Sequence, residues 1–104
     1  MPDQSEGEAR KAAVKAGDSD RLLPGENPES THPDDARHWV EVYRELLAYK
    51  DRLLAVTQAT LSEVPDEPAR REVAETDQTL IAAERERFAR RLAFWDRRLV
   101  ELKP

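Results

Sequence analysis

The chain has 104 residues, of which 38% are apolar and 38% are charged, and its formal net charge is −5. This length and composition are typical of one small domain with polar segments attached, and they exclude a second domain. Because the chain has no cysteine, disulfide bonds, a thiol nucleophile and cysteine-ligated metal centres are excluded as well.

The first residues lack the basic start and the apolar run of a signal peptide. No stretch approaches the roughly 18 apolar residues that a membrane-spanning helix needs. We therefore expect a cytoplasmic protein without membrane association.

Residues 1–32 are predicted to form a disordered acidic tail. Glycine, proline and charged residues dominate them, and Leu22-Leu23 is their one pair of large apolar residues. Such a segment buries too little apolar surface to offset the entropy of ordering it, although a weak helix over 8–15 is compatible with the sequence. Leu22-Leu23-Pro24-Gly25 is either a docking motif that folds on a partner or a plain linker, and we favour the linker.

Residues 33–104 are predicted to form a helical hairpin with a helix over 33–64, a turn over 65–67 and a helix over 68–103. Polar residues precede Pro33 and two aspartates follow it, while acids precede Pro68, and both patterns are typical of a helix start. Apolar residues then recur at steps of three and four along each helix. The main members of the two stripes are Trp39, Val40, Tyr43, Leu46, Leu47, Leu54 and Leu61, and Val73, Leu80, Ile81, Phe88, Leu92, Trp95 and Leu99.

The fold class that follows is all-α: an antiparallel, coiled-coil-like pair of helices with an aromatic cluster at the end far from the turn. Antiparallel pairing about the turn sets Tyr43 near Phe88 and Trp39 near Trp95. A second row, Val42, Tyr49 and Val56, recurs every seven residues and widens the apolar face of the first helix. We therefore expect a homodimer that completes a four-helix bundle.

A polar layer interrupts the middle of the hairpin. Lys50 lies on the apolar stripe of the first helix, and Asp77 and Glu84 flank Leu80 on the second. Because an unpaired buried charge is very costly, we predict that Lys50 pairs with Glu84 or Asp77. The alternative interpretation of the same residues is a small-ligand-sensing helical bundle that uses this layer.

Motifs of catalytic and cofactor sites do not emerge from the sequence. The three glycines, at 7, 17 and 25, all lie in the predicted tail, which leaves no phosphate-binding loop. Glu29 with His32 and Asp35 with His38 match an acid-x-x-His spacing, but they lie before or at the first turn of a helix and cannot aim into a bundle. We expect no catalytic residue, no cofactor and no metal.

The end of the second helix is basic, with seven bases against three acids from Arg85 to Lys103, a local net charge of +4. The interleaved acids and the net charge of −5 argue against a nucleic-acid partner, because phosphate binding needs a basic face and a favourable overall charge. A protein partner is the better expectation, and the candidate contacts are Phe94, Arg90, Arg91, Arg97 and Arg98. A variant of this hypothesis has the acidic tail folding back on the basic stretch as a salt-sensitive autoinhibitor.

The function that these patterns favour is a non-enzymatic protein–protein interaction module, a scaffold or a regulator that acts through the helical hairpin. The ligand sensor described above is the alternative, and a small enzyme ranks third. The sequence contains nothing that identifies the partner.

Overall fold

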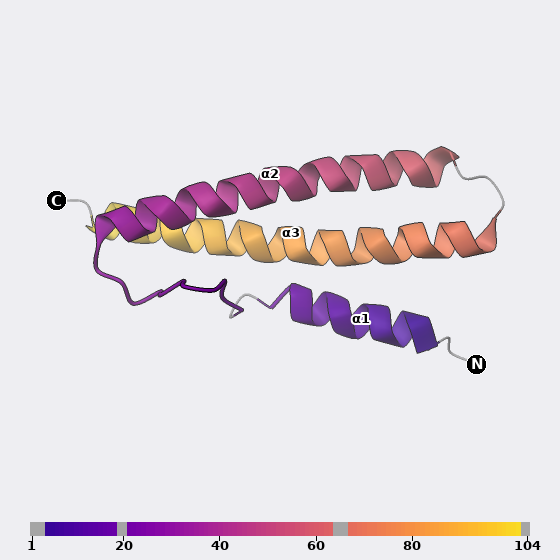
Figure 1. Cartoon of the computed structure of the whole chain (residues 1–104), viewed down its shortest axis with the longest axis horizontal. Coiled ribbons are helices and arrows are strands. Elements are labelled where there is room, and N and C mark those ends of the chain that lie inside the picture. The colour runs from indigo at the N-terminus through magenta and orange to yellow at the C-terminus, as the bar shows by residue number, and fades with distance from the viewer. Residues whose placement is uncertain (1–3, 19–20, 64–66, 103–104) are drawn as a thin grey trace.

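The computed structural model describes residues 4–18, 21–63 and 67–102 and shows three helices in these ranges: α1 (Gln4–Ala16), α2 (Pro33–Glu63) and α3 (Pro68–Leu102). α2 and α3 lie side by side and antiparallel, and α1 lies beside the turn-proximal part of α3 (Figure 1). The molecule is elongated, with extents of 58 × 27 × 17 Å. The all-α class and the long antiparallel helix pair are therefore as predicted.

Both long helices begin at the predicted residues, Pro33 and Pro68. At the first of these starts, the backbone N–H of Asp35 donates to the carbonyl of His32 at 3.1 Å, and the Ser30 hydroxyl bonds the Asp35 carboxylate at 2.5 Å. Neither helix contains glycine, or proline after its first residue, so nothing interrupts them. The predicted helix end at 64, the turn residues 65 and 66, and residue 103 lie outside the described residues.

The predicted register is confirmed by ring contacts and one ion pair between α2 and α3. The rings of Tyr43 and Phe88 lie 5.9 Å apart between centroids, and those of Trp39 and Trp95 lie 6.5 Å apart. Closer to the turn, Lys50 Nζ lies 3.1 Å from Glu84 Oε2. These three contacts, between residues 39–50 of α2 and 84–95 of α3, agree on one antiparallel alignment.

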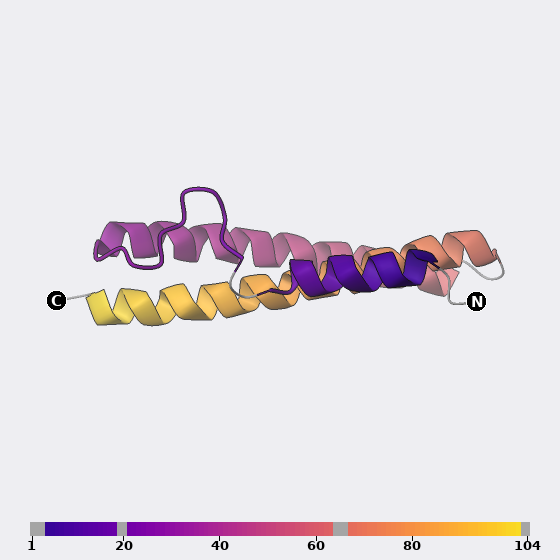
Figure 2. The ribbon, with the colours of Figure 1, turned by 90° about the horizontal axis from the view of Figure 1, so that it is seen from below.

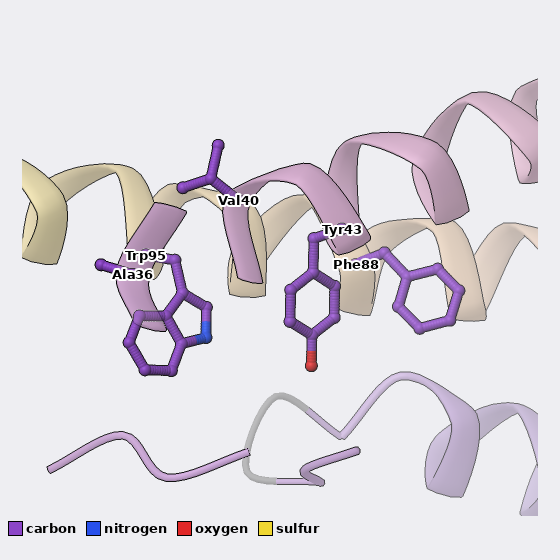
Figure 3. Close-up of a cluster of buried hydrophobic side chains, with 5 residues drawn as sticks. All are labelled: Ala36, Val40, Tyr43, Phe88 and Trp95. Carbon is purple, nitrogen blue, oxygen red and sulfur yellow. The ribbon is translucent and has the colours of Figure 1, made fainter. Parts of the chain in front are cut away.

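The core occupies the aromatic end of the hairpin, far from the turn. Its buried members come from both long helices (Figure 3), namely Ala36, Val40, Tyr43, Phe88 and Trp95. Towards the turn, Ala74 is the single buried residue among those described at 44–63 and 67–86. The two halves of the hairpin are therefore packed very differently.

The structure does not show the disordered tail that the sequence predicted over 1–32. Within its described part, α1 covers Gln4–Ala16, and the chain then continues through residues 21–32, which we call the strap. The strap runs past the aromatic end of the hairpin and returns to the start of α2 (Figure 2). The prediction considered apolar burial alone, whereas the strap is attached chiefly through polar groups, as described next.

α1 rests on α3 with little apolar contact. Val14, its one large apolar residue, is exposed. After the helix, the Gly17 carbonyl accepts a hydrogen bond from Arg90, and the backbone at Gly17 passes close to Ala83. The docking of α1 therefore depends on small residues and a polar contact rather than on a shared core.

Candidate functional site

A buried carboxylate joins the strap to the hairpin. The side chain of Glu26 is 0% exposed and accepts five hydrogen bonds. Oε2 accepts from Arg91 Nη2 at 2.6 Å, from Arg91 Nε at 3.1 Å and from the Trp95 indole N–H at 2.7 Å. Oε1 accepts from the Tyr43 hydroxyl and from the backbone N–H of Leu23 at 3.0 Å. We call the donor groups of Tyr43, Arg91 and Trp95 the carboxylate pocket.

The elements that position these groups are distinct. Tyr43 comes from α2, and its ring extends from that helix with the hydroxyl towards the strap (Figure 3). Arg91 and Trp95 come from α3, and their spacing of four residues puts them on one face of the helix. The Arg91 guanidinium also lies 4.5 Å from the centroid of the Phe94 ring, and this cation–π contact helps to hold the guanidinium in place. Packing within the hairpin thus aims all three donors at one point.

The strap presents Glu26 through a tight turn formed by Leu23-Pro24-Gly25-Glu26. The N–H of Glu26 donates to the Leu23 carbonyl at 3.0 Å, and Gly25 has a φ of 83°. Proline second and glycine third in a turn, with a positive φ at the glycine, define a type II turn. Leu23 then packs against the edge of the aromatic core. The motif that we interpreted as a linker is therefore a folded anchor.

The surroundings keep Glu26 ionised. Burial alone would raise the pKa of its carboxyl, but the hydrogen bonds from Tyr43, Leu23, Trp95 and Arg91 outweigh burial and hold this pKa below its ordinary value of 4.5. Burial and the same hydrogen bond to Glu26 raise the pKa of the Tyr43 phenol above its ordinary value of 10.0. Each group is thus held in the form that makes the bond, a carboxylate accepting from a neutral hydroxyl.

A second buried arginine lies on the same side of α3. Arg87 is 5% exposed, its guanidinium lies 4.7 Å from the centroid of the Phe88 ring, and among the described residues its Nε and Nη1 have no hydrogen-bond partner. Burial, followed by the charge of Arg21 on the strap, lowers the pKa of Arg87. The strap therefore supplies Arg91 with a counter-charge, whereas its Arg21 adds a like charge that acts on Arg87.

The structure separates the predicted partner-contact residues into two groups. Arg91 is buried in the carboxylate pocket, Phe94 is partly buried against the core, and Arg98 donates to the Ser30 carbonyl at 3.2 Å. Arg90 and Arg97 remain exposed, although Arg90 also bonds the Gly17 carbonyl. In this arrangement, most of the predicted contact surface is occupied by the chain's own N-terminal segment.

The predicted polar layer comes together only in part. Lys50 and Glu84 form the predicted ion pair, with side chains 15% and 24% exposed. Asp77 is exposed and lies about two helical turns nearer the hairpin turn. It borders an open hollow of about 370 Å³ lined by Thr60, Arg70, Val73, Ala74 and Asp77, and Lys50 and Glu84 do not line this hollow. The three groups therefore do not share one ligand site.

Metal-ligating side chains do not cluster in the described ranges. Within 4–18, 21–63 and 67–102, no group of three or more histidines and acids is arranged to hold a metal ion. His32 and His38 are both exposed. None of the three described helices is long and apolar enough to cross a membrane.

Glu26 is the residue that sequence analysis missed. Its partners on α3 are 65 and 69 residues away, so no local pattern links them. The Leu-Pro-Gly-Glu turn was the available signal, because proline and glycine at these positions predict a fixed type II turn rather than a flexible linker. No protein-family model, curated protein or solved structure matches this chain.

Proposed function

We propose that this chain is a non-enzymatic protein-interaction module, a scaffold or regulator that pairs with a second copy of itself into a four-helix bundle. The observation that carries the proposal is an apolar row on the outer face of α2. Val42, Tyr49 and Val56 form this row at intervals of seven residues, and Tyr49 and Val56 are 49% and 63% exposed. A row with this spacing is the seam through which helices pair.

The row lies on the side of α2 that α3 leaves uncovered. Val40 and Tyr43, which are buried, face α3, and Tyr49 and Val56 lie about 120° or more around the helix from them. A second hairpin laid along this row would bury it without disturbing the existing core. Apolar surface removed from water contributes about 25 cal/mol per Å², so a helix-length seam adds useful stability.

Charge complementarity favours a second copy as the occupant. Glu45 and Arg52 are exposed on the same face as Tyr49, one on each side of it. If two copies cross antiparallel with a two-fold axis near Tyr49, Glu45 of one copy approaches Arg52 of the other, twice over. A self-complementary patch of this kind is what a symmetric dimer requires.

A small core gives the pairing an energetic reason. Here the core is confined to the aromatic end, and the turn-proximal half contributes partly buried leucines such as Leu53, Leu54 and Leu61. The dimer would lengthen the core towards the turn.

The test is the mass of the purified chain in solution over a dilution series, with helix content followed at the same concentrations. We expect twice the chain mass of 11.9 kDa and a joint loss of mass and helicity on dilution. Val56→Glu should yield a monomer, whereas Val100→Glu, at an exposed valine of α3, is the matched control and should stay dimeric. A monomeric wild type at all concentrations would refute the pairing.

A further inference from the structure

The carboxylate pocket is built by the hairpin alone, without help from the strap. Ring contacts inside the hairpin hold its donors: Tyr43 against Phe88 at 5.9 Å and Trp95 against Trp39 at 6.5 Å, with Phe94 packed edge-on to Trp95 at 5.1 Å. These contacts do not involve residues 21–32. The pocket is therefore a preformed receptor for a carboxylate, and Glu26 is the group that fills it.

The occupant is equally self-contained. The turn from Leu23 to Glu26 is closed by two internal hydrogen bonds, from the Glu26 N–H to the Leu23 carbonyl and from the Leu23 N–H to Glu26 Oε1. Its shape is set by Pro24 and Gly25. Any polypeptide with a leucine three residues before a glutamate in such a turn could offer the pocket the same groups.

We propose that the aromatic end of the hairpin is a receptor for a glutamate-bearing turn of a partner protein, and that the chain's own strap is a tethered occupant that closes this receptor until the partner displaces it. This interface is separate from the apolar row on α2 and does not depend on dimer formation. A polar attachment suits a reversible contact, because the donors of the pocket are satisfied by Glu26 when the strap is closed and by water when it is open. A permanent attachment would be served as well by apolar residues.

The strap does not make every favourable contact with the hairpin, so a partner could bind the same site with higher affinity. The charge of Arg21 on the strap repels the buried Arg87, and Nε and Nη1 of Arg87 have no hydrogen-bond partner among the described residues. A partner turn with an acid in the place of Arg21 would replace this repulsion by attraction. The ligand that the pocket selects is thus an acidic peptide with a glutamate at the position of Glu26 and a second acid five residues earlier.

The short linker between the strap and α2 determines how tightly a partner must bind to displace the strap. Seven positions separate Glu26 from Pro33, where α2 begins, and a short linker of this kind gives an effective concentration on the order of millimolar. A partner at about 10 μM therefore has to bind about a hundredfold more tightly than the strap to displace half of it. The second acid supplies part of this difference.

The experiment uses labelled synthetic peptides of residues 18–32 and the full chain with Glu26→Gln, whose strap is weakened and whose pocket is intact. Fluorescence anisotropy should show that the native peptide binds the Glu26→Gln chain, and that the Arg21→Glu peptide binds this chain about tenfold more tightly. The native peptide should bind the wild-type chain about a hundredfold more weakly, because the tethered strap competes with it. The Glu29→Gln peptide is the matched control and should bind like the native one, whereas the Glu26→Gln peptide should not bind.

Leu23→Asp is a second variant with an open strap, to be used if Glu26→Gln does not fold. It removes the apolar contact of the strap and leaves the pocket residues unchanged. Helix content measured by circular dichroism establishes that either chain is folded. If folded open chains fail to bind the native peptide, or bind the Glu26→Gln and Glu29→Gln peptides alike, the receptor is refuted. If the wild type is a dimer that Glu26→Gln abolishes and Val56→Glu preserves, the pocket takes the strap of a second copy, and the assignment to another protein is overturned.

Discussion

Replacing Glu26 by glutamine should open the strap while leaving the hairpin folded. Glutamine keeps one carbonyl oxygen, which can still accept from Tyr43 and from the Leu23 N–H. Its amide group replaces Oε2, where Arg91 and Trp95 now donate, so three of the five hydrogen bonds are lost. Arg91 is then left buried without its counter-charge.

The free-energy cost of Glu26→Gln for the closed strap follows from the loss of the ion pair with Arg91. Removing one partner of a buried pair costs about 3 to 5 kcal/mol, which corresponds to an increase of about 100- to 4,000-fold in the opening equilibrium of the strap. The cost is local, because an open strap lets Arg91 regain water while Val40, Phe88 and Trp95 still pack between α2 and α3.

Amide hydrogen exchange resolved by residue measures this opening directly. The N–H groups of Leu23 and of residue 26 are both bonded within the turn, so their exchange reports whether the strap is closed. Glu29→Gln is the matched control, since it removes the same charge from an exposed position of the same strap, and it should change exchange by less than about 0.5 kcal/mol. Unchanged protection of Leu23 in Glu26→Gln would show that the carboxylate does not hold the strap.

The remaining predictions concern pH, the polar layer and the core. The lowered pKa of Glu26 stabilises the closed strap above its unfolded value near 4.5, and the raised pKa of Tyr43 does so below its unfolded value near 10.0. Exchange of the strap amides, divided by their intrinsic rate at each pH, should therefore increase as the pH falls below about 4.5 or rises above about 10. Tyr43→Phe should remove the alkaline limb and also weaken the acid limb, because it removes a hydrogen bond that lowers the pKa of Glu26. Replacing both Lys50 and Glu84 by leucine should keep or slightly raise the melting temperature, because the pair is partly buried and even fully buried ion pairs are often replaced by apolar residues without loss of stability. A large loss of stability in the double variant would contradict this. Light scattering would show whether the pair also determines the oligomeric state. Phe88→Ala should cost about 3 to 5 kcal/mol in urea unfolding, and a cost below about 1 kcal/mol would mean that the aromatic end is not the core.

The hairpin could be predicted because its rules are local or periodic. Proline followed by acids fixed the start at Pro33, and the three- and four-residue steps fixed which faces of α2 and α3 meet. Once the turn was placed, antiparallel geometry alone brought Tyr43 to Phe88 and Lys50 to Glu84, as the structure shows. Each of these inferences needs only neighbouring residues and one turn.

The strap could not be predicted in this way, because its attachment depends on one long-range polar cluster. A count of apolar residues over 1–32 correctly finds little to bury, but it cannot register a glutamate whose five hydrogen bonds come from three separate segments. Arg91 was misjudged for the same reason. Within a run of arginines it was predicted to contact a partner, and only the carboxylate supplied by Glu26 allows it to be buried.

The two ends of the hairpin therefore suit different kinds of contact. At the aromatic end, Val40, Phe88 and Trp95 are buried, and the donors of the carboxylate pocket converge on one point, which favours a specific and displaceable charged ligand. Towards the turn, the large apolar residues are only partly buried, and the outer face of α2 offers Tyr49 and Val56 to solvent, which favours extended and less selective helix pairing. Because the two surfaces share no residue, closure of the strap can change while the pairing of helices stays the same. Under the two proposals, the chain would remain in a dimer while its carboxylate pocket opens and closes.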